Sequence, residues 1–327
     1  MADLACKYLG LNLRNPLIVS SSGLTDNIDK IVQLQDSGAG AIVVKSLFEE
    51  EIDFEEGRML EIQPSTWPGA EEYASFFSRK NSVDDYLKLL ETSKRKLSIP
   101  VIASINCLGA GDWINIIRRI ESTGVDALEL NIFFFPDDKD FRSEDYEKTY
   151  YDIVTKVAYK LDIPVVVKIS PYFTNLLYFV DQIFHRGAKG VSLFNRFFLP
   201  DIDLDSFELK TADNLEDLSD FYQTLRWVNI ISANFNNIDI AASIGINGSE
   251  AAIKLLLSGA NAIMLCSALY KNGNEYLSII SKGIIDWMDK KGFNKIEQFQ
   301  GQLNYSIVQD TFLYERSQFI KNFDLLQ

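Results

Sequence analysis

The sequence of 327 residues contains only one histidine and three cysteines, and this scarcity excludes several kinds of active site. A single histidine cannot build a multi-histidine zinc centre. His185 lies near the end of the helix expected over residues 175–186, where it suits a helix C-terminal cation better than a member of a Ser-His-Asp triad. We therefore predict that the protein holds no metal and performs neither metal-dependent nor serine-type hydrolysis.

The sequence also has no apolar run of membrane-spanning length, and residues 1–16 lack the apolar core of a signal peptide. Cys6, Cys107 and Cys266 form no CxxC motif and cannot all pair. This usage of cysteine indicates a reducing compartment and no disulfide framework. Together, these absences predict a cytoplasmic protein.

Positive charge is in deficit, with 32 lysines and arginines against 46 aspartates and glutamates and a formal net charge of −14. Such a balance argues against nucleic acids and anionic membrane surfaces as partners. We expect a small-molecule ligand instead. If that ligand is an anion, local donors must hold it, because the overall field repels it.

Apolar segments of strand length alternate with helical segments through about eight repeats. We expect strands at residues 16–20, 41–44, 101–106, 127–131, 165–169, 190–194, 238–241 and 262–265. We expect helices at residues 27–37, 83–97, 113–122, 144–161, 175–186 and 222–233. This alternation predicts a (β/α)₈ TIM barrel. The alternative, a doubly wound sheet, is weaker because no G-x-G-x-x-G motif follows the first strand.

The remaining segments are expected to decorate one domain that spans residues 1–327, since no domain boundary is visible. Residues 4–8 and 11–14 around Leu9-Gly10 predict a β-hairpin that plugs one end of the fold. Residues 47–81 are expected to form a long functional loop, and residues 196–218 an acidic insert without a clear period. Residues 303–327 carry apolar side chains and are expected to pack as a C-terminal helical extension.

The stretch over residues 238–269 reads strand, small-residue turn, amphipathic helix and second strand. Its turns, Ser243-Ile244-Gly245 and Cys266-Ser267, follow the last two predicted strands. The loops after the last two strands of a TIM barrel frequently hold a phosphate, and small residues let backbone N–H groups approach it. The alternative is a purely structural turn, because small residues close most strand-to-helix turns.

Polar residues occur at or just after the ends of the other predicted strands. They are Ser22-Gly23, Lys45-Ser46, Asn106-Cys107, Asn131, Lys168 and Asn195. In a TIM barrel these strand ends form the active-site face. Lys168 directly follows the apolar run Val165–Val167, and lysine is rarely buried without a partner. We therefore favour a functional role for Lys168 over a solvated position at a strand end.

These residues carry a resemblance to the dihydroorotate dehydrogenase family, and most of all to its class 1 members. The matching segments, in order along nearly the whole chain, are NPLIVSSSG, VVKS, ELN, VVVKISPYF and the stretch over residues 238–269. The resemblance implies an FMN-dependent oxidoreductase of pyrimidine biosynthesis that acts on a CH–CH group. It also implies a homodimer, whereas no cysteine cluster implies an iron–sulfur partner subunit.

The resemblance assigns roles residue by residue. The residues expected to line FMN are Ser22, Gly23, Lys45, Ser46, Asn131 and Lys168, and those expected to hold its phosphate are Ser243, Ile244, Gly245, Cys266 and Ser267. Lys168 is expected at the N1/O2 edge of the flavin, where a cation stabilises the reduced ring. Lys45, Asn131 and Asn195 are expected to bind the substrate.

The segments that would bind the substrate differ from the motifs of the family. Phe134 falls where class 1 members carry a catalytic cysteine, and phenylalanine cannot accept a proton. The substrate segment Asn-x-x-Gly-Leu-Pro-Asn is absent, since the corresponding region reads QPSTWPGAEEY. Ile244 replaces a usual glycine. General-base catalysis is worth about 10²–10⁴-fold, so we expect slow oxidation of dihydroorotate.

Cys107 is the other cysteine near the predicted face and is a candidate base, although a small buried hydrophobic residue is the better interpretation. Three functions therefore stay open. The first is a dihydroorotate dehydrogenase-like enzyme, and the second is an FMN oxidoreductase for another flat polar substrate. The third is a barrel without redox turnover, either a flavin-binding protein or a lyase that binds a phosphorylated metabolite.

Overall fold

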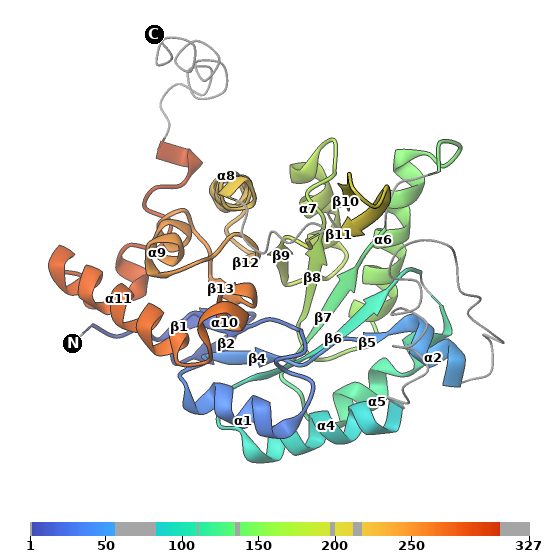
Figure 1. Cartoon of the computed structure of the whole chain (residues 1–327), viewed down its shortest axis with the longest axis horizontal. Coiled ribbons are helices and arrows are strands. Elements are labelled where there is room, and N and C mark those ends of the chain that lie inside the picture. Colours follow the sequence, from blue (N-terminus) through green and yellow to red (C-terminus); the bar gives the residue numbers. More distant parts are fainter. Residues whose placement is uncertain are drawn as a thin grey trace, which may run out of the picture.

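The computed structural model describes residues 2–55, 83–109, 111–134, 138–196, 200–211 and 218–307. Eight parallel strands form a closed ring around a buried interior (Figure 1). In chain order these strands are β3 (Leu17–Val19), β4 (Ala41–Val43), β6 (Val101–Cys107), β7 (Ala127–Ile132), β8 (Val165–Ile169), β9 (Gly190–Leu193), β12 (Asp239–Ala242) and β13 (Ala262–Leu265). The pairing of β4 with β6 closes the ring. The predicted TIM barrel is confirmed.

Helices surround the ring because each buries one apolar stripe against the strands. They are α1 (Ile28–Asp36), α4 (Val83–Lys96), α5 (Ile117–Ser122), α6 (Ser143–Ala158), α7 (Leu176–His185), α8 (Leu218–Asn234), α9 (Ser249–Leu257), α10 (Ser267–Asn272) and α11 (Tyr276–Lys291). Asn27 and Asn175 cap α1 and α7 by accepting a hydrogen bond from a first-turn N–H. Most predicted helices therefore lie where expected. However, α8 begins earlier, and the segment predicted as one helix over 113–122 divides into η1 (Asp112–Asn115) and α5.

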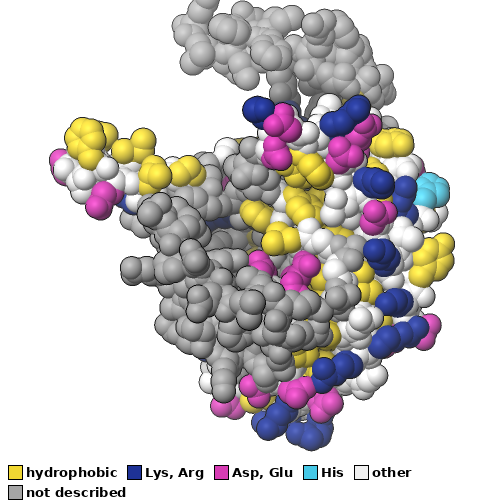
Figure 2. All heavy atoms as spheres, turned by 90° about the vertical axis from the view of Figure 1, so that its right-hand side faces the viewer, with side chains coloured by type: hydrophobic (Ala, Val, Ile, Leu, Met, Phe, Trp, Pro, Cys, Tyr) yellow, Lys and Arg dark blue, Asp and Glu magenta, His cyan; other side chains and the backbone are white. Residues whose placement is uncertain are grey.

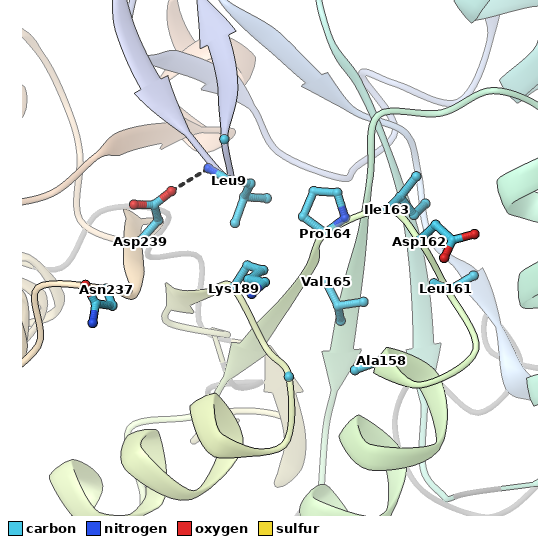
Figure 3. A pocket seen from close by; sticks show the side chains of 12 residues that line it. Leu9, Ala158, Leu161, Asp162, Ile163, Pro164, Val165, Lys189, Asn237 and Asp239 are labelled. Atoms are coloured by element: carbon cyan, nitrogen blue, oxygen red, sulfur yellow. Dashed lines mark hydrogen bonds between the residues drawn. The ribbon is translucent and has the colours of Figure 1, made fainter.

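The predicted N-terminal hairpin is confirmed, as β1 (Cys6–Tyr8) pairs antiparallel with β2 (Leu11–Leu13). Its turn contacts the beginning of two barrel strands. The Leu9 N–H donates to Asp239 Oδ2 of β12 at 2.5 Å (Figure 3). A Cβ added to Gly190 of β9 would lie 2.7 Å from Leu9 Cδ2 and 2.9 Å from the backbone carbonyl oxygen of Asp239, so the strand and the hairpin approach closely at this glycine. The hairpin therefore covers the N-terminal end of the barrel.

Two segments differ from the expectation. Residues 47–81 do not begin as a loop, because β5 (Leu47–Phe48) adds to β6 and is followed by α2 (Glu49–Glu55); residues 56–82 lie outside the described part. The acidic insert contains a second hairpin, β10 (Pro200–Asp203) with β11 (Glu208–Thr211). Its apolar side chains face solvent, with Phe207 92% exposed, so no buried face imposed a readable period on the sequence.

After α11 the chain forms two short 3₁₀ turns, η2 (Ile296–Gln298) and η3 (Tyr305–Ile307). The predicted C-terminal extension over 303–327 lies mostly outside the described residues, which end at 307. Within the described ranges no helix has the length and apolarity needed to cross a membrane. Figure 2 shows lysine and arginine side chains gathered down one side of the face drawn there, so the charge of the surface is uneven.

The hairpin contact yields a stability prediction. Leu9 is 6% exposed against the barrel, whereas Leu204, in the turn between β10 and β11, is 82% exposed. We expect Leu9→Ala to lower the free energy of unfolding by about 2–4 kcal/mol because it removes buried apolar contacts. The matched Leu204→Ala variant should change it by less than about 0.5 kcal/mol. Urea unfolding of both variants measures the difference, and equal losses would contradict the assigned position of the hairpin.

Candidate functional site

The strand register places four polar residues side by side near the C-terminal ends of β6, β7, β8 and β9. Asn106 pairs with Asn131, Asn131 with Lys168, and Lys168 with Ser192. Register partners in parallel strands point to the same side. Ser192 Oγ donates to Met264 Sδ of β13 at 3.0 Å, and β13 is not a neighbour of β9, so this bond crosses the barrel interior. The whole row therefore faces inward.

Two asparagines of the candidate site are joined directly. Asn195 Nδ2 donates to Asn131 Oδ1 at 2.6 Å, and the Asn195 N–H donates to the carbonyl oxygen of Ile169 at 2.8 Å. Asn195 is 7% exposed. The bond fixes the rotation of both amides, which leaves the Asn131 NH₂ group as a donor and the Asn195 carbonyl as an acceptor. The structure thus brings together two residues that the sequence places 64 positions apart.

A chain of serine hydroxyls runs from the strand ends into the barrel. Ser21 Oγ lies 2.9 Å from Ser46 Oγ, and Ser46 Oγ lies 2.8 Å from Ser104 Oγ. Ser104 Oγ donates to Glu129 Oε1 at 3.2 Å. The Ser46 N–H also donates to Ser21 Oγ at 2.8 Å, which fixes the outer end of the chain. These bonds connect the loops after β3 and β4 with the interior faces of β6 and β7.

Glu129 is a fully buried carboxyl group, with 0% exposure. Burial raises its pKa, while the positive charge of Lys168 and the hydrogen bond from Ser104 oppose the rise. Its Oε2 atom has no hydrogen-bond partner among the described residues. The sequence analysis missed Glu129, although a charged residue inside the apolar strand Ala127–Ile132, two positions before the inward-facing Asn131, was a readable signal.

The turns after β12 and β13 have the close backbone packing expected of a ligand cradle. Gly245 has φ +76°, and a Cβ there would lie 2.3 Å from the backbone N of Phe221 in α8, so only glycine fits. The N-cap residues Gly248 of α9 and Cys266 of α10 make no side-chain capping bond. Among the described residues, therefore, neither N-cap side chain occupies the first N–H groups of its helix, which suits the binding of an anion.

The loops after β3 and β13 lie next to each other and to Lys168. Ser22 hydrogen-bonds the Cys266 thiol; burial raises the pKa of that thiol, and Ser22 and Lys168 lower it. A Cβ added to Gly23 would lie 2.8 Å from the Tyr270 hydroxyl, so Gly23 also faces α10. The structure therefore gathers the predicted residues of the first, fifth and last strands at one end of the barrel.

Lys45 stands in the loop after β4 and donates its backbone N–H to the Thr25 carbonyl at 3.1 Å. Its positive charge lowers the pKa of Glu51, which burial raises. His185, in contrast, lies on the outer surface of α7, where its ring Nδ1–H donates to the Asp181 carbonyl oxygen at 2.9 Å. Its side chain is 66% exposed. No group of three His, Cys, Asp or Glu residues within the described ranges is placed to hold a metal ion.

Comparison with known proteins identifies the family. The family model for dihydroorotate dehydrogenase matches residues 3–288. The chain belongs to the dihydroorotate dehydrogenase family. This membership supports an oxidoreductase, and it confirms the resemblance found in the sequence.

Individual relatives match over nearly their full length. The chain is 26% identical to the catalytic subunit of dihydroorotate dehydrogenase B (NAD(+)) of Thermoplasma acidophilum, covering 92% of this chain and 99% of the relative. It is also 26% identical to dihydroorotate dehydrogenase (fumarate) of Lachancea kluyveri, covering 93% and 99%. A dihydroorotate dehydrogenase from Eimeria tenella, solved in complex with ferulenol, superposes with a TM-score of 0.65 at 16% identity over 91% of this chain and 88% of that one. The last match shows the shared fold.

Phe134, in the loop after β7, packs within a group of aromatic side chains. Its ring centroid lies 5.3 Å from that of Tyr150 and 6.5 Å from that of Tyr146, both on α6. These side chains line a cavity of about 130 Å³, together with Ser143, Glu147, Ser170, Tyr172, Phe173 and Thr174. Phe134 therefore joins the end of β7 to α6 and supplies no acid or base there.

Cys107 at the end of β6 is fully buried. Burial raises the pKa of its thiol well above the usual value, and the charges of Glu49 and Glu50 raise it further. A thiol in such surroundings stays protonated at neutral pH and is a poor base. The environment of Cys107 accordingly favours a packing role over the catalytic candidate role.

A different cavity, of about 420 Å³, opens at the opposite end of the barrel beside Leu9 (Figure 3). Its lining includes Pro164, Lys189 and Asp239, which stand at the beginnings of β8, β9 and β12. Active sites of TIM-barrel enzymes lie at the C-terminal ends of the strands. The candidate site is therefore the polar end that contains Lys168, Asn131 and Asn195, and not this cavity.

The burial of Glu129 predicts a pH-dependent stability. Its pKa is raised from the ordinary 4.5, so the folded protein keeps a proton that the unfolded chain releases. Stability should therefore fall as the pH rises from about 4.5 through the raised pKa. We expect Glu129→Gln to gain stability relative to wild type as the pH rises from 4 to 8, because the glutamine has no proton to lose.

Thermal or urea unfolding at both pH values measures this gain. Glu250→Gln is the control, because the Lys254 hydrogen bond lowers the pKa of this exposed carboxyl, and any effect should have the opposite sign. A wild-type protein and a Glu129→Gln variant that follow the same pH profile would contradict the assigned burial.

Proposed function

We propose that the protein is an FMN-dependent oxidoreductase that transfers hydride from a dihydropyrimidine-like substrate to FMN. The observation that carries this proposal is the position of Lys168. It lies in the inward-facing polar row between Asn131 and Ser192, and its charge acts on Cys266 of the last loop. A cation in this position suits the edge of a flavin that becomes negatively charged on reduction.

The donors at this end of the barrel fit FMN. Ser243, Ile244, Gly245, Cys266 and Ser267 would hold the phosphate through backbone N–H groups, which is consistent with the close approach at Gly245 and the free helix starts of α9 and α10. Ser22, Gly23, Lys45, Ser46, Asn131 and Lys168 would line the ring. Bound FMN supplies the hydride acceptor of the reaction.

The residues of the chain bind and orient the substrate. The Asn131 NH₂ group and the Asn195 carbonyl offer one donor and one acceptor in fixed directions, the pattern that a cyclic amide or imide requires. Lys45 would bind a carboxylate of the substrate. With Phe134 in the loop after β7, the proton that accompanies hydride loss has no acceptor at the family's usual position.

The Phe134 environment also favours a second candidate, an FMN oxidoreductase for a different flat substrate. The aromatic cavity of about 130 Å³ beside Phe134 offers stacking faces, which a polar catalytic loop would not.

The proposal also includes a cytoplasmic location, which the free cysteines support, and a homodimer, which the resemblance supports.

Release of the cofactor tests the proposal. We expect the denatured protein to release FMN, and added FMN to raise the melting temperature, since a ligand that binds only the folded state stabilises it. Under anaerobic conditions dihydroorotate should reduce the flavin slowly, about 10²–10⁴-fold below a base-containing homologue. Dithionite should reduce it normally. Absence of FMN and of any thermal shift would refute the proposal in favour of a phosphate-ligand barrel.

Replacement of Lys168 tests its assigned role. We expect Lys168→Ala to lower the two-electron reduction potential of the flavin by about 30 mV or more, because the reduced anionic ring loses its cation. Lys189→Ala is the matched control, since Lys189 precedes β9 at the opposite end of the barrel. Equal potentials in wild type and Lys168→Ala, measured by redox titration, would show that Lys168 does not face the flavin.

A further inference from the structure

The mechanism proposed above leaves one buried carboxyl unused. Glu129 stands inside the barrel with 0% exposure, and three serine hydroxyls link it to the C-terminal end. The successive distances are 3.2 Å from Glu129 Oε1 to Ser104 Oγ, 2.8 Å to Ser46 Oγ and 2.9 Å to Ser21 Oγ. Ser104 is also 0% exposed and Ser46 is 7% exposed, whereas Ser21 is partly exposed at the strand end.

The hydrogen bonds of this chain have one consistent direction. Ser104 donates to the carboxylate, so its oxygen accepts from Ser46. The Ser46 oxygen then accepts from Ser21, whose own oxygen accepts from the Ser46 N–H. Each hydroxyl is thus a donor toward Glu129 and an acceptor on its outer side. A proton that reaches Ser21 Oγ can be passed inward by three successive short transfers.

The groups that face Glu129 act on its ionisation in opposite directions. Lys168 of β8 stabilises the carboxylate, as does the Ser104 hydroxyl of β6. Burial favours the neutral acid, and Oε2 lacks a partner within the described ranges. Burial raises the pKa of Tyr86 of α4 and of Tyr8 of β1, and the Glu129 charge raises each further, so both hydroxyls stay neutral. Lys168 is therefore the positive charge that favours the carboxylate form of Glu129 against the effect of burial.

We propose that Glu129 is the proton acceptor of the site, reached through a proton-conducting chain of Ser21, Ser46 and Ser104. This inference rests on the proposed oxidoreductase function. Oxidation of the substrate releases a hydride to FMN and one proton. That proton binds Ser21 Oγ, the Ser21 proton moves to Ser46, the Ser46 proton to Ser104 and the Ser104 proton to Glu129 Oε1. Glu129 becomes a neutral acid, the three serines are regenerated, and no electrons move along the chain.

The serine hydroxyls explain how a family member with Phe134 could transfer the substrate proton away from the site. Glu129 does not touch the reacting atoms, so it acts as a proton store that works through the serines. Reversal of the same transfers returns the proton to solvent at the barrel end, which resets the carboxylate for the next turnover.

A pH jump followed by time-resolved infrared spectroscopy tests the chain in the purified protein, without substrate. Acidification should produce a carboxylic acid C=O band that is absent from Glu129→Gln, or that changes in frequency in Glu129→Asp if the first variant does not fold. We expect Ser104→Ala to slow the appearance of this band at least tenfold. Ser192→Ala is the matched control, because Ser192 is also an inward-facing serine with 0% exposure but bonds Met264.

The infrared rates of these variants either support or overturn the proposed proton transfer. If the Glu129 band appears more slowly in Ser104→Ala but at the wild-type rate in Ser192→Ala, the proposed proton transfer through the serines is supported. Equal rates in wild type and Ser104→Ala, equal slowing in both variants, or no Glu129 band between pH 9 and pH 4 would overturn it. Because no flavin reaction is measured, a conducting chain in a protein that releases no FMN would reject the proposed function separately.

A second measurement tests the link to the reaction. In the flavin-loaded protein, Glu129→Gln and Ser104→Ala should each lower the rate of anaerobic reduction by dihydroorotate at least tenfold and flatten its pH profile. Reduction by dithionite, which requires no substrate proton, should keep its wild-type rate. Unchanged rates and an unchanged pH profile with dihydroorotate would show that the substrate proton leaves by another route.

Discussion

The register of the closed parallel barrel is the constraint on which the site depends. Once β4 pairs with β6, each strand must present alternate side chains to the interior, and neighbouring strands align their inward residues in rows. One row contains Asn106, Asn131, Lys168 and Ser192, and the row beneath it contains Ser104 and Glu129. A shift of one residue in any of these strands would turn its polar side chain outward, and a shift in β7 or β8 would separate Lys168 from Asn131.

Polar groups inside a barrel carry a desolvation cost, and this structure offsets it by pairing them. Ser104 donates a hydrogen bond to Glu129, the positive charge of Lys168 stabilises the Glu129 carboxylate, and Ser192 donates a hydrogen bond to Met264. Within the described residues, however, Glu129 Oε2 has no hydrogen-bond partner. Incompletely satisfied buried carboxyl groups are typical of functional sites, where ionisation must change during the reaction. The same network therefore contributes both to the packing of the barrel and to the chemistry proposed for it.

The family membership and the departure proposed at Phe134 fit one physical picture. The residues expected around FMN lie together at the strand ends, whereas Phe134 in the loop after β7 packs on the aromatic side chains of α6. The hydride acceptor and the proton acceptor of an oxidation are separate groups, so one can change while the other is retained. The serine chain to Glu129 would supply the second group from inside the barrel, close to the β3 and β4 loops.

The sequence by itself determined the barrel, the hairpin over Cys6–Leu13 and the strand-end positions of Lys168 and Asn131, because strand and helix periods and strand-end residues are local properties. Only the tertiary structure decided which of these residues meet. The Asn195–Asn131 bond, the serine chain and the burial of Glu129 join residues from different strands, and their alignment follows from barrel closure. The β10–β11 hairpin was unreadable because its apolar side chains face solvent, so no packing constraint shaped its pattern.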